Sequence, residues 1–266
     1  MSKSSDTSRE PQPDDPRPLN ARSLALSALL GTHPPVLSAG ALVALAELFG
    51  ISGGAMRTAL SRLAAAGDVV VDDARYSLAP RLVARQAAQD AGRRSSPVEW
   101  DGRWHTAVAV ADQRELSDRR HTRVVMANAR FGELRPDIWL RPANLPAPEL
   151  GDTWMVTTGT PVGVDPARLV ARIWDLDQIG RTAARFDARL AAAAAAIDPD
   201  DPTEIPAAFT LSAAVLRFLR SEPLLPRDLT PADWPLDRLR ERYGSFERGL
   251  QTMMRPFLAR SAGSGD

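Results

Sequence analysis

The sequence of 266 residues contains no cysteine, a single lysine (Lys3) and three histidines. The absence of cysteine excludes disulfide bonds, thiol nucleophiles, zinc sites built on thiolates and iron–sulfur clusters. The histidines, His33, His105 and His121, do not have the short spacing of a metal-binding motif. We therefore expect no metal site.

Long apolar runs are also absent, and none approaches the roughly 20 residues that a membrane-spanning helix requires. Residues 1–18 are rich in Ser, Pro and Asp, lack the apolar segment of a secretory signal, and predict a disordered tail. The 33 basic residues balance 33 acidic ones, so no overall charge draws the chain to nucleic acid or to a membrane. These features predict a cytoplasmic protein.

Sequence signatures of common enzyme classes are missing as well. The chain has no P-loop, no G-x-G-x-x-G fingerprint and no spacing typical of a Ser–His–acid triad. We therefore expect no catalytic residue and no cofactor, and we interpret the chain as a protein that is not an enzyme.

The pattern of apolar residues indicates an α+β protein with three domains. Residues 19–90 predict short amphipathic helices followed by a pair of strands, and the polar residues 91–100 predict a linker. In residues 101–164 strands alternate with a helix, and residues 165–261 are helical. For the middle domain we expect strands at 104–111, 138–141 and 154–158 and a helix at about 115–130.

Two apolar stripes in the last domain repeat every three or four residues. The first contains Leu176, Ile179, Ala183, Phe186 and Leu190, and the second contains Leu236, Leu239, Tyr243, Phe246, Leu250, Met253 and Phe257. Such stripes require an apolar partner surface. Two interpretations are open: both stripes form the core of a helical bundle, or one helix also forms the seam of a homodimer.

Residues 38–67 predict a helix-turn-helix. Ser38 can cap a first amphipathic helix, and Gly50 permits the sharp turn that follows it. Ser52 can cap a second helix, which Gly67 ends. Two short helices joined by a glycine-containing turn are typical of DNA-binding domains.

The second of these helices has two distinct faces at about 100° per residue. One face is apolar and consists of Met56, Ala59, Leu60 and Leu63. The other carries small residues, hydroxyls and arginines but no acid, namely Gly54, Arg57, Thr58, Ser61 and Ala65, with Arg62 at its flank. Phosphate repels acidic residues, whereas Arg, Ser and Thr bind phosphates and base edges. We therefore predict DNA contacts from Ser52, Arg57, Thr58, Ser61 and Arg62.

Residues 68–78 predict two strands joined by a turn at 72–74, which is the pattern of a wing. Arg75 follows this turn and is a further candidate for DNA contact, although Asp72 and Asp73 argue against strong phosphate binding by the wing. Residues 19–96 contain eight arginines and five acidic residues, a net charge of +3 that favours DNA binding at this end of the chain.

Five segments resemble the motifs of one family. ISGGAMRTALSRLAAAGDVVV resembles the recognition-helix segment of the PaaX-type regulators, the phenylacetate-catabolism repressors. EWDGRWHTAVAV and RFGELRPDIWLRPAN resemble the middle-domain motifs of that family, and RIWDLDQIGRTAARF and LTPADWP resemble two C-terminal motifs. The resemblance spans residues 19 to about 259. It implies an N-terminal winged helix-turn-helix, a middle ferredoxin-like α/β domain and a C-terminal helical domain.

The resemblance also implies a function. Members of this family are homodimeric repressors of catabolic operons that bind double-stranded DNA operators and are released by an acyl-CoA, phenylacetyl-CoA in the founding cases. An operator read by such a dimer is expected to be an inverted repeat. Where the family tends to have a His–acid–aromatic–Arg run, residues 213–216 are Ala-Ala-Val-Leu. This departure leaves two alternatives open, a different effector or none.

Candidate ligand-binding residues follow from side-chain chemistry, because indole rings stack on adenine or aryl groups and guanidinium groups bind phosphates. They are Trp100, Arg103, Trp104, Arg141 and Arg172. An alternative from another class is an acyl-CoA-binding or protein-interaction module whose winged helix is degenerate and has no specific operator.

Overall fold

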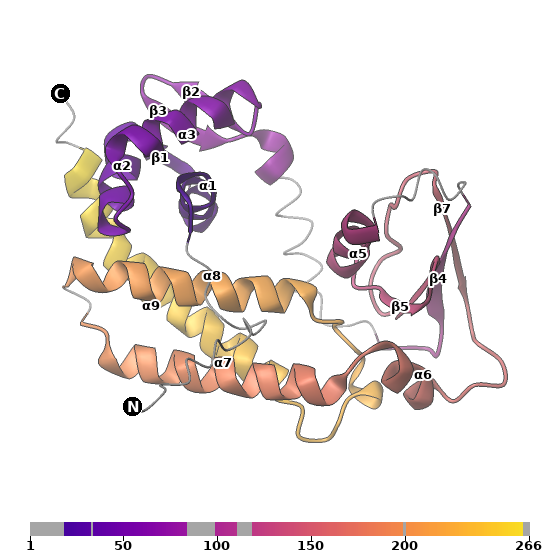
Figure 1. Cartoon of the computed structure of the whole chain (residues 1–266). Coiled ribbons are helices and arrows are strands. Elements are labelled where there is room, and N and C mark those ends of the chain that lie inside the picture. The colour runs from indigo at the N-terminus through magenta and orange to yellow at the C-terminus, as the bar shows by residue number, and fades with distance from the viewer. Residues whose placement is uncertain (1–18, 33, 84–98, 111–118, 199–200, 263–266) are drawn as a thin grey trace, which may run out of the picture.

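The computed structural model describes residues 19–32, 34–83, 99–110, 119–198 and 201–262. Figure 1 shows an N-terminal group of helices with a small sheet, a second sheet to one side, and long helices that pass beneath the first group. The predicted tail, residues 1–18, lies outside the described residues, as does most of the predicted linker. The architecture is the mixed α+β arrangement expected from the sequence.

The N-terminal group contains the short helices α1 (Ala21–Gly31), α2 (Ala39–Leu48) and α3 (Gly53–Ala65). Both predicted serine caps are present, because Ser38 Oγ accepts the Ala41 N–H at 3.1 Å and Ser52 Oγ accepts the Ala55 N–H at 3.2 Å. Gly50 and Gly67 have φ values of +69° and +66°, which explains why glycine follows each helix. The helix-turn-helix prediction is confirmed.

The small sheet has the strand order β1-β3-β2, with β1 at Val36–Ser38, β2 at Val69–Asp72 and β3 at Arg75–Leu78. All pairings are antiparallel, and β2 and β3 form the predicted hairpin. Asp73 and Ala74 in its turn both have positive φ, which suits the twist of a two-residue hairpin. β1 was not predicted, because three residues are too few to show an alternating pattern.

The middle sheet contains β4 (Trp104–Ala109), β5 (Gly132–Arg135), β6 (Ile138–Pro142) and β7 (Trp154–Gly159). Its order is β5-β6-β4-β7, its pairs are antiparallel, and α5 (Arg119–Asn128) connects β4 to β5. The three predicted strands are present, whereas β5 was missed because Gly-Glu-Leu-Arg has no apolar alternation. A ferredoxin-like unit carries a second helix before its last strand, but here residues 143–153 are irregular.

The C-terminal helices are α6 (Pro166–Ile173), α7 (Leu176–Ala196), α8 (Ile205–Ser221) and α9 (Leu236–Ala262), with short 3₁₀ turns at Pro202–Glu204 and Arg227–Leu229. The side chains of the second apolar stripe lie in α9 and pack against α7, α8 and α2. Six of these seven side chains are buried, and Phe257 is partly buried. The bundle-core interpretation is therefore correct for this stripe, whereas the seam of a homodimer stays a prediction.

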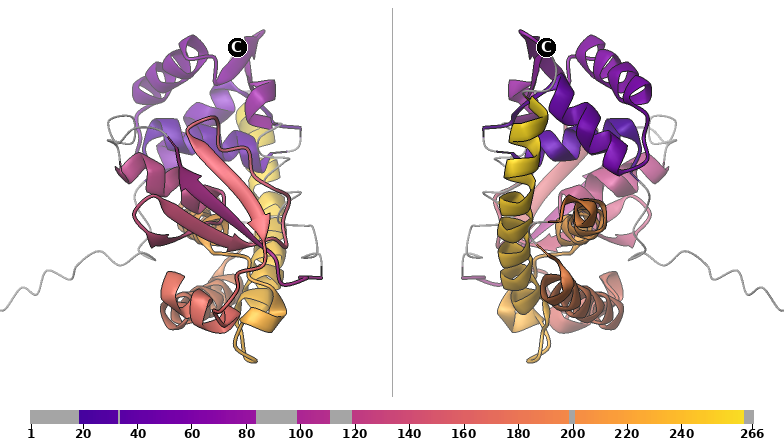
Figure 2. Two further views of the ribbon diagram at one scale, coloured as in Figure 1. Left: turned by 90° about the vertical axis from the view of Figure 1, so that its right-hand side faces the viewer. Right: turned by 90° about the vertical axis from the view of Figure 1, so that its left-hand side faces the viewer.

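The helix α9 also joins the N-terminal helices to the C-terminal bundle. Figure 2 shows it running the length of the molecule, with its last turns beside the N-terminal group. Buried residues of α1, α2 and α3 form one continuous apolar core with those of α7, α8 and α9. Gly40 in α2 allows the close approach, because a Cβ there would lie 2.9 Å from the carbonyl oxygen of Ser261. The helix-turn-helix thus has a fixed position on the bundle.

A buried ion-pair network attaches the middle domain to the same bundle. Arg130 follows α5, has a φ of +65°, and donates through Nη1 to the carbonyl oxygens of Leu219, at 2.9 Å, and Glu222. The Glu222 side chain is only 1% exposed; its carboxylate lies 3.8 Å from Arg130 and accepts a 2.5 Å hydrogen bond from Arg240 in α9. One carboxylate therefore compensates two guanidinium groups from different parts of the chain.

Replacing Glu222 by Gln should lower the free energy of unfolding by about 3 kcal/mol, because it removes a buried carboxylate that compensates the guanidinium groups of both Arg130 and Arg240. Asp237→Asn is the matched control: Asp237 also pairs with Arg240, at 2.9 Å, but its side chain is 70% exposed. We expect that control to change stability by about 0.5 kcal/mol at most. Urea denaturation measures both, and equal effects would contradict this account.

Candidate nucleic-acid interface

The two faces of α3 lie as predicted. Met56, Leu60 and Leu63 are fully buried against the other N-terminal helices, and Ala59 is partly buried. All of the residues assigned to the outer face are exposed, namely Gly54, Arg57, Thr58, Ser61, Arg62 and Ala65. The helix therefore presents to solvent a face that contains two arginines, two hydroxyls and no carboxylate.

The hydroxyl groups on this helix differ in what they can offer a ligand. Ser52 Oγ caps the helix, and Thr58 Oγ1 donates its proton to the carbonyl oxygen of Gly54 at 2.9 Å. Thr58 can therefore accept a hydrogen bond from a base amino group but is not placed to donate to a phosphate. Ser61, for which the described residues supply no hydrogen-bond partner, can do both.

The arginines of the N-terminal group fall into two classes. Arg22 and Arg81 share the carboxylate of Asp68, at 2.5 and 2.6 Å, and hydrogen bonds from these two side chains hold the pKa of Asp68 below its usual value. Within the described ranges, no ion-pair partner is found for Arg57, Arg62 or Arg75, which are all exposed. The charges that remain uncompensated are therefore those of the predicted DNA-binding residues.

Arg75 lies apart from the residues of α3. It pairs in register with Asp72 in β2 and Ser38 in β1, and the adjacent turn accepts the N–H of Ala39, the first residue of α2, at 3.0 Å. Because α3 begins at the other end of α2, roughly the 15 Å length of that helix separates Arg75 from Ser52. The structure thus groups five of the predicted DNA-binding residues on α3 and its N-cap and places the sixth on the hairpin.

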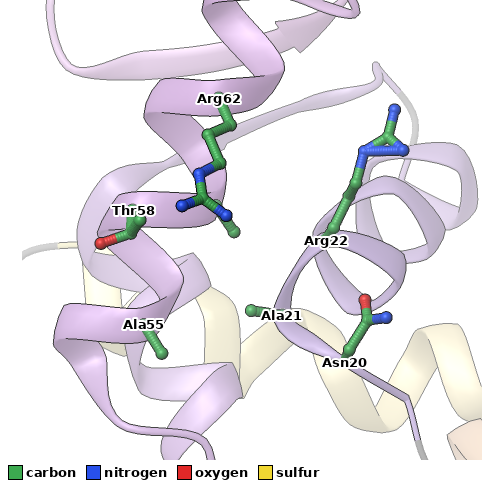
Figure 3. Close-up of a pocket in the computed structure, with 7 residues that line it drawn as sticks. Asn20, Ala21, Arg22, Ala55, Thr58 and Arg62 are labelled. Carbon is green, nitrogen blue, oxygen red and sulfur yellow. The ribbon is translucent and has the colours of Figure 1, made fainter.

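A groove of about 420 Å³ borders the exposed face of α3. Figure 3 shows its two sides, formed by α3 and by the start of α1. Thr58 and Arg62 line it from α3, and Asn20 and Arg22 line it from α1. Sequence reasoning missed the α1 residues because their role depends on packing between helices that are far apart in the chain.

Three of the candidate ligand-binding residues lie together at the start of β4. The rings of Trp100 and Trp104 meet edge to face at 6.1 Å, and Trp100 Nε1 donates to the carbonyl oxygen of Arg103 at 2.7 Å. Arg103 forms an exposed ion pair with Asp101 at 2.6 Å. Trp104 is buried, and its Nε1 has no hydrogen-bond partner among the described residues.

The other two ligand candidates lie elsewhere. Arg141 is paired in register with His105, so it projects from the opposite face of the sheet to Trp104. It donates to the carbonyl oxygens of Ala129 and Pro146, and burial lowers its pKa to about 10. Arg172 is exposed in the last turn of α6. The five candidates therefore do not form one site. Arg141 instead connects the loops that contain Ala129 and Pro146 to the sheet through hydrogen bonds.

The departure from the family motif at residues 213–216 falls in the middle of α8. Ala214 and Val215 are buried in the shared apolar core, and Ala213 and Leu216 are partly buried.

Across the part of the chain that the structure describes, no group of three His, Asp or Glu side chains is placed to hold a metal ion. Nor is any described helix long and apolar enough to cross a membrane.

Comparison with known proteins identifies the family. Residues 20–82 match the family model of the PaaX-like proteins, and residues 174–260 match that of the PaaX-like C-terminal domain. The chain belongs to the PaaX-like family. Membership implies a PaaX-type transcriptional regulator rather than an enzyme. The two matched segments of this PaaX-like protein contain α1–α3 with the hairpin, and most of α7–α9.

A solved structure is similar over nearly the whole PaaX-like chain. It is the uncharacterized protein Rv0674 from Mycobacterium tuberculosis, with 35% sequence identity and a TM-score of 0.67. The match covers 90% of this chain and 98% of that one, so it includes the middle domain, which the family models do not match. No curated protein matches the chain.

The arrangement of α3 predicts that two substitutions one turn apart have different effects. Arg57→Ala should weaken DNA binding by about 1–3 kcal/mol and leave stability nearly unchanged, because the side chain is exposed and has no ion pair within the described residues. Leu60→Ala should lower the free energy of unfolding by about 2–5 kcal/mol, because that side chain is 0% exposed. Fluorescence anisotropy and urea denaturation separate the two. Wild-type DNA affinity in Arg57→Ala would show that this side of α3 does not face DNA.

Proposed function

We propose that this PaaX-like protein is a repressor that binds a specific DNA operator through α3. The observation that carries the proposal is the exposed face of α3, which has no acidic residue and carries Arg57 and Arg62, neither of which forms an ion pair within the described residues. Family membership supports it, because PaaX-type proteins are transcriptional regulators.

The chemistry of this face suits the major groove. Gly54 and Ala65 are small, so they allow the helix to approach the base edges closely, and Arg57 lies between the flanking helix α2 and the open face. A guanidinium group can bind guanine O6 and N7 together, which is the commonest specific contact. Arg62 and Ser61 are placed to contact the backbone or neighbouring bases.

We propose further that the repressor is a homodimer that binds an inverted repeat. A single α3 can contact only a few base pairs, and helix-turn-helix proteins extend the site by placing two copies about one DNA turn apart. Because the stripe of α9 packs inside the chain, we propose that the contact between two copies uses other surfaces.

The test combines light scattering of the protein with footprinting on DNA from upstream of its own gene. We expect a dimer at micromolar concentration and two protected half-sites with centres about 34–36 Å apart. A monomer that protects one undivided half-site would refute the homodimer but not DNA binding. Binding that is weak and equal on operator and scrambled DNA would favour the alternative of a degenerate winged helix.

An acyl-CoA released by catabolism, with an arylacetyl group such as phenylacetyl in the family's founding cases, is the effector class that we propose. Release requires that the effector bind the DNA-competent and DNA-incompetent states with different affinities. The shared core offers a route for this coupling, because a shift of α9 relative to α7 and α8 would move α2 with it. The effector would then bind outside residues 19–90.

Titration of the full-length protein–operator complex with a panel of acyl-CoAs tests this proposal, with free CoA as the control. A coupling of about 1–3 kcal/mol should weaken operator binding roughly 5- to 150-fold for the matching thioester. Free CoA should have no effect. If no thioester shifts the midpoint more than about twofold, acyl-CoA control is refuted while operator binding stands.

A further inference from the structure

The groove beside α3 has a composition that suits an anion. Asn20, Ala21 and Arg22 from the start of α1 form one side, and Ala55, Thr58, Ala59 and Arg62 from α3 form the other. Among the described residues that line it are two arginines and no acidic residue. Three of the seven lining residues are alanines, so the space between the two helices is not filled by long side chains.

Its two arginines are held differently. Arg62 lies on the α3 side of the groove, where its side chain extends along the helix towards Thr58 (Figure 3), and it has no ion-pair partner in the described ranges. Arg22 is bound to Asp68 at 2.5 Å, yet 58% of its side chain is exposed, and a guanidinium has five N–H donors. Asp68 accepts from both Arg22 and Arg81, so the three side chains together keep a charge of +1. Arg22 is thus positioned by Asp68 and still has donors for another partner.

The position of the groove identifies that partner. Thr58 and Arg62 belong both to the groove and to the exposed face of α3 that we assign to the major groove. Each major groove is bordered by sugar–phosphate backbone, so a backbone strand lies beside the flank of an inserted helix. We propose that this groove binds a phosphate of the DNA backbone, with Arg62 and Arg22 as its ligands and Asp68 as the residue that positions Arg22. This inference rests on the proposed function.

A first experiment uses Arg22→Gln and Arg62→Gln in the full chain, with Arg168→Gln, an exposed arginine of α6, as the control. Fluorescence anisotropy measures binding to operator and to scrambled duplex at about 50 to 200 mM salt. Because a phosphate contact carries no sequence information, each variant should lose affinity for both duplexes by a similar factor. Each should also reduce the slope of log K against log salt by about 1. The control should match wild type.

A second pair of variants separates the groove from folding. Ala55 lies in the groove and three residues after the cap Ser52, so either Glu or Gln there completes a capping box and supports the helix. Ala55→Glu also places a carboxylate in the groove, about two helical turns from Arg62, whereas Ala55→Gln does not. We expect Ala55→Glu to bind both duplexes at least about tenfold more weakly than Ala55→Gln, with melting temperatures at or above that of wild type.

The outcomes distinguish this inference from the proposed function. Unchanged salt slopes in Arg22→Gln and Arg62→Gln, or equal DNA binding by Ala55→Glu and Ala55→Gln, would overturn the phosphate site alone. A loss confined to the operator would also overturn it, since that indicates a base contact. Wild-type protein that binds neither duplex would overturn the phosphate site and the proposed function together.

Discussion

Burial of the apolar stripe of α9 on two sides is the constraint on which the arrangement of the molecule depends. The helix packs against α7 and α8 along most of its length and against α2 near its end. A stripe of seven large apolar side chains would be costly to expose, at about 1.5–3 kcal/mol for each buried one. The helix-turn-helix is consequently one part of a larger core, and the orientation of α3 follows from the packing of the C-terminal helices.

Buried ion pairs attach the middle domain to the C-terminal helices. The carboxylate of Glu222 has almost no exposure, and it meets Arg130 from the loop after α5 and Arg240 from α9. Arg130 adopts a left-handed backbone conformation that costs a residue with a side chain roughly 1 kcal/mol or more. Hydrogen bonds from its side chain to the last carbonyl groups of α8 offset that cost. The middle sheet is therefore linked to the same bundle that holds α2, which provides a physical path between the middle domain and α3.

On the surface of the N-terminal group, the distribution of ion pairs matters more than the number of arginines. With 33 basic residues in the chain, the presence of an arginine is a weak indicator of function. Asp68 forms ion pairs with Arg22 and Arg81, whereas Arg57 and Arg62 form no ion pair with the described residues. The same helix face has small residues, Gly54 and Ala65, which suit the close approach to DNA that we propose. The exposed face of α3 thus has both the positive charge and the shape that suit the proposed DNA contact. The groove between α3 and α1 adjoins this face.

The sequence by itself determined what depends on neighbouring residues. The serine caps, the glycine turns, the two faces of α3, the hairpin at 68–78 and the stripes of α7 and α9 all follow from local spacing, and the structure has each of them. The five family motifs also carried the family assignment. Tertiary structure alone decided which partner surface each stripe uses, because an apolar stripe specifies only that some apolar surface must cover it. It likewise decided the pairing of Arg22 with Asp68, 46 residues away, the role of Arg141 as a tie between loops, and the groove between α1 and α3. Contacts of that kind depend on how distant segments pack, which local sequence does not encode.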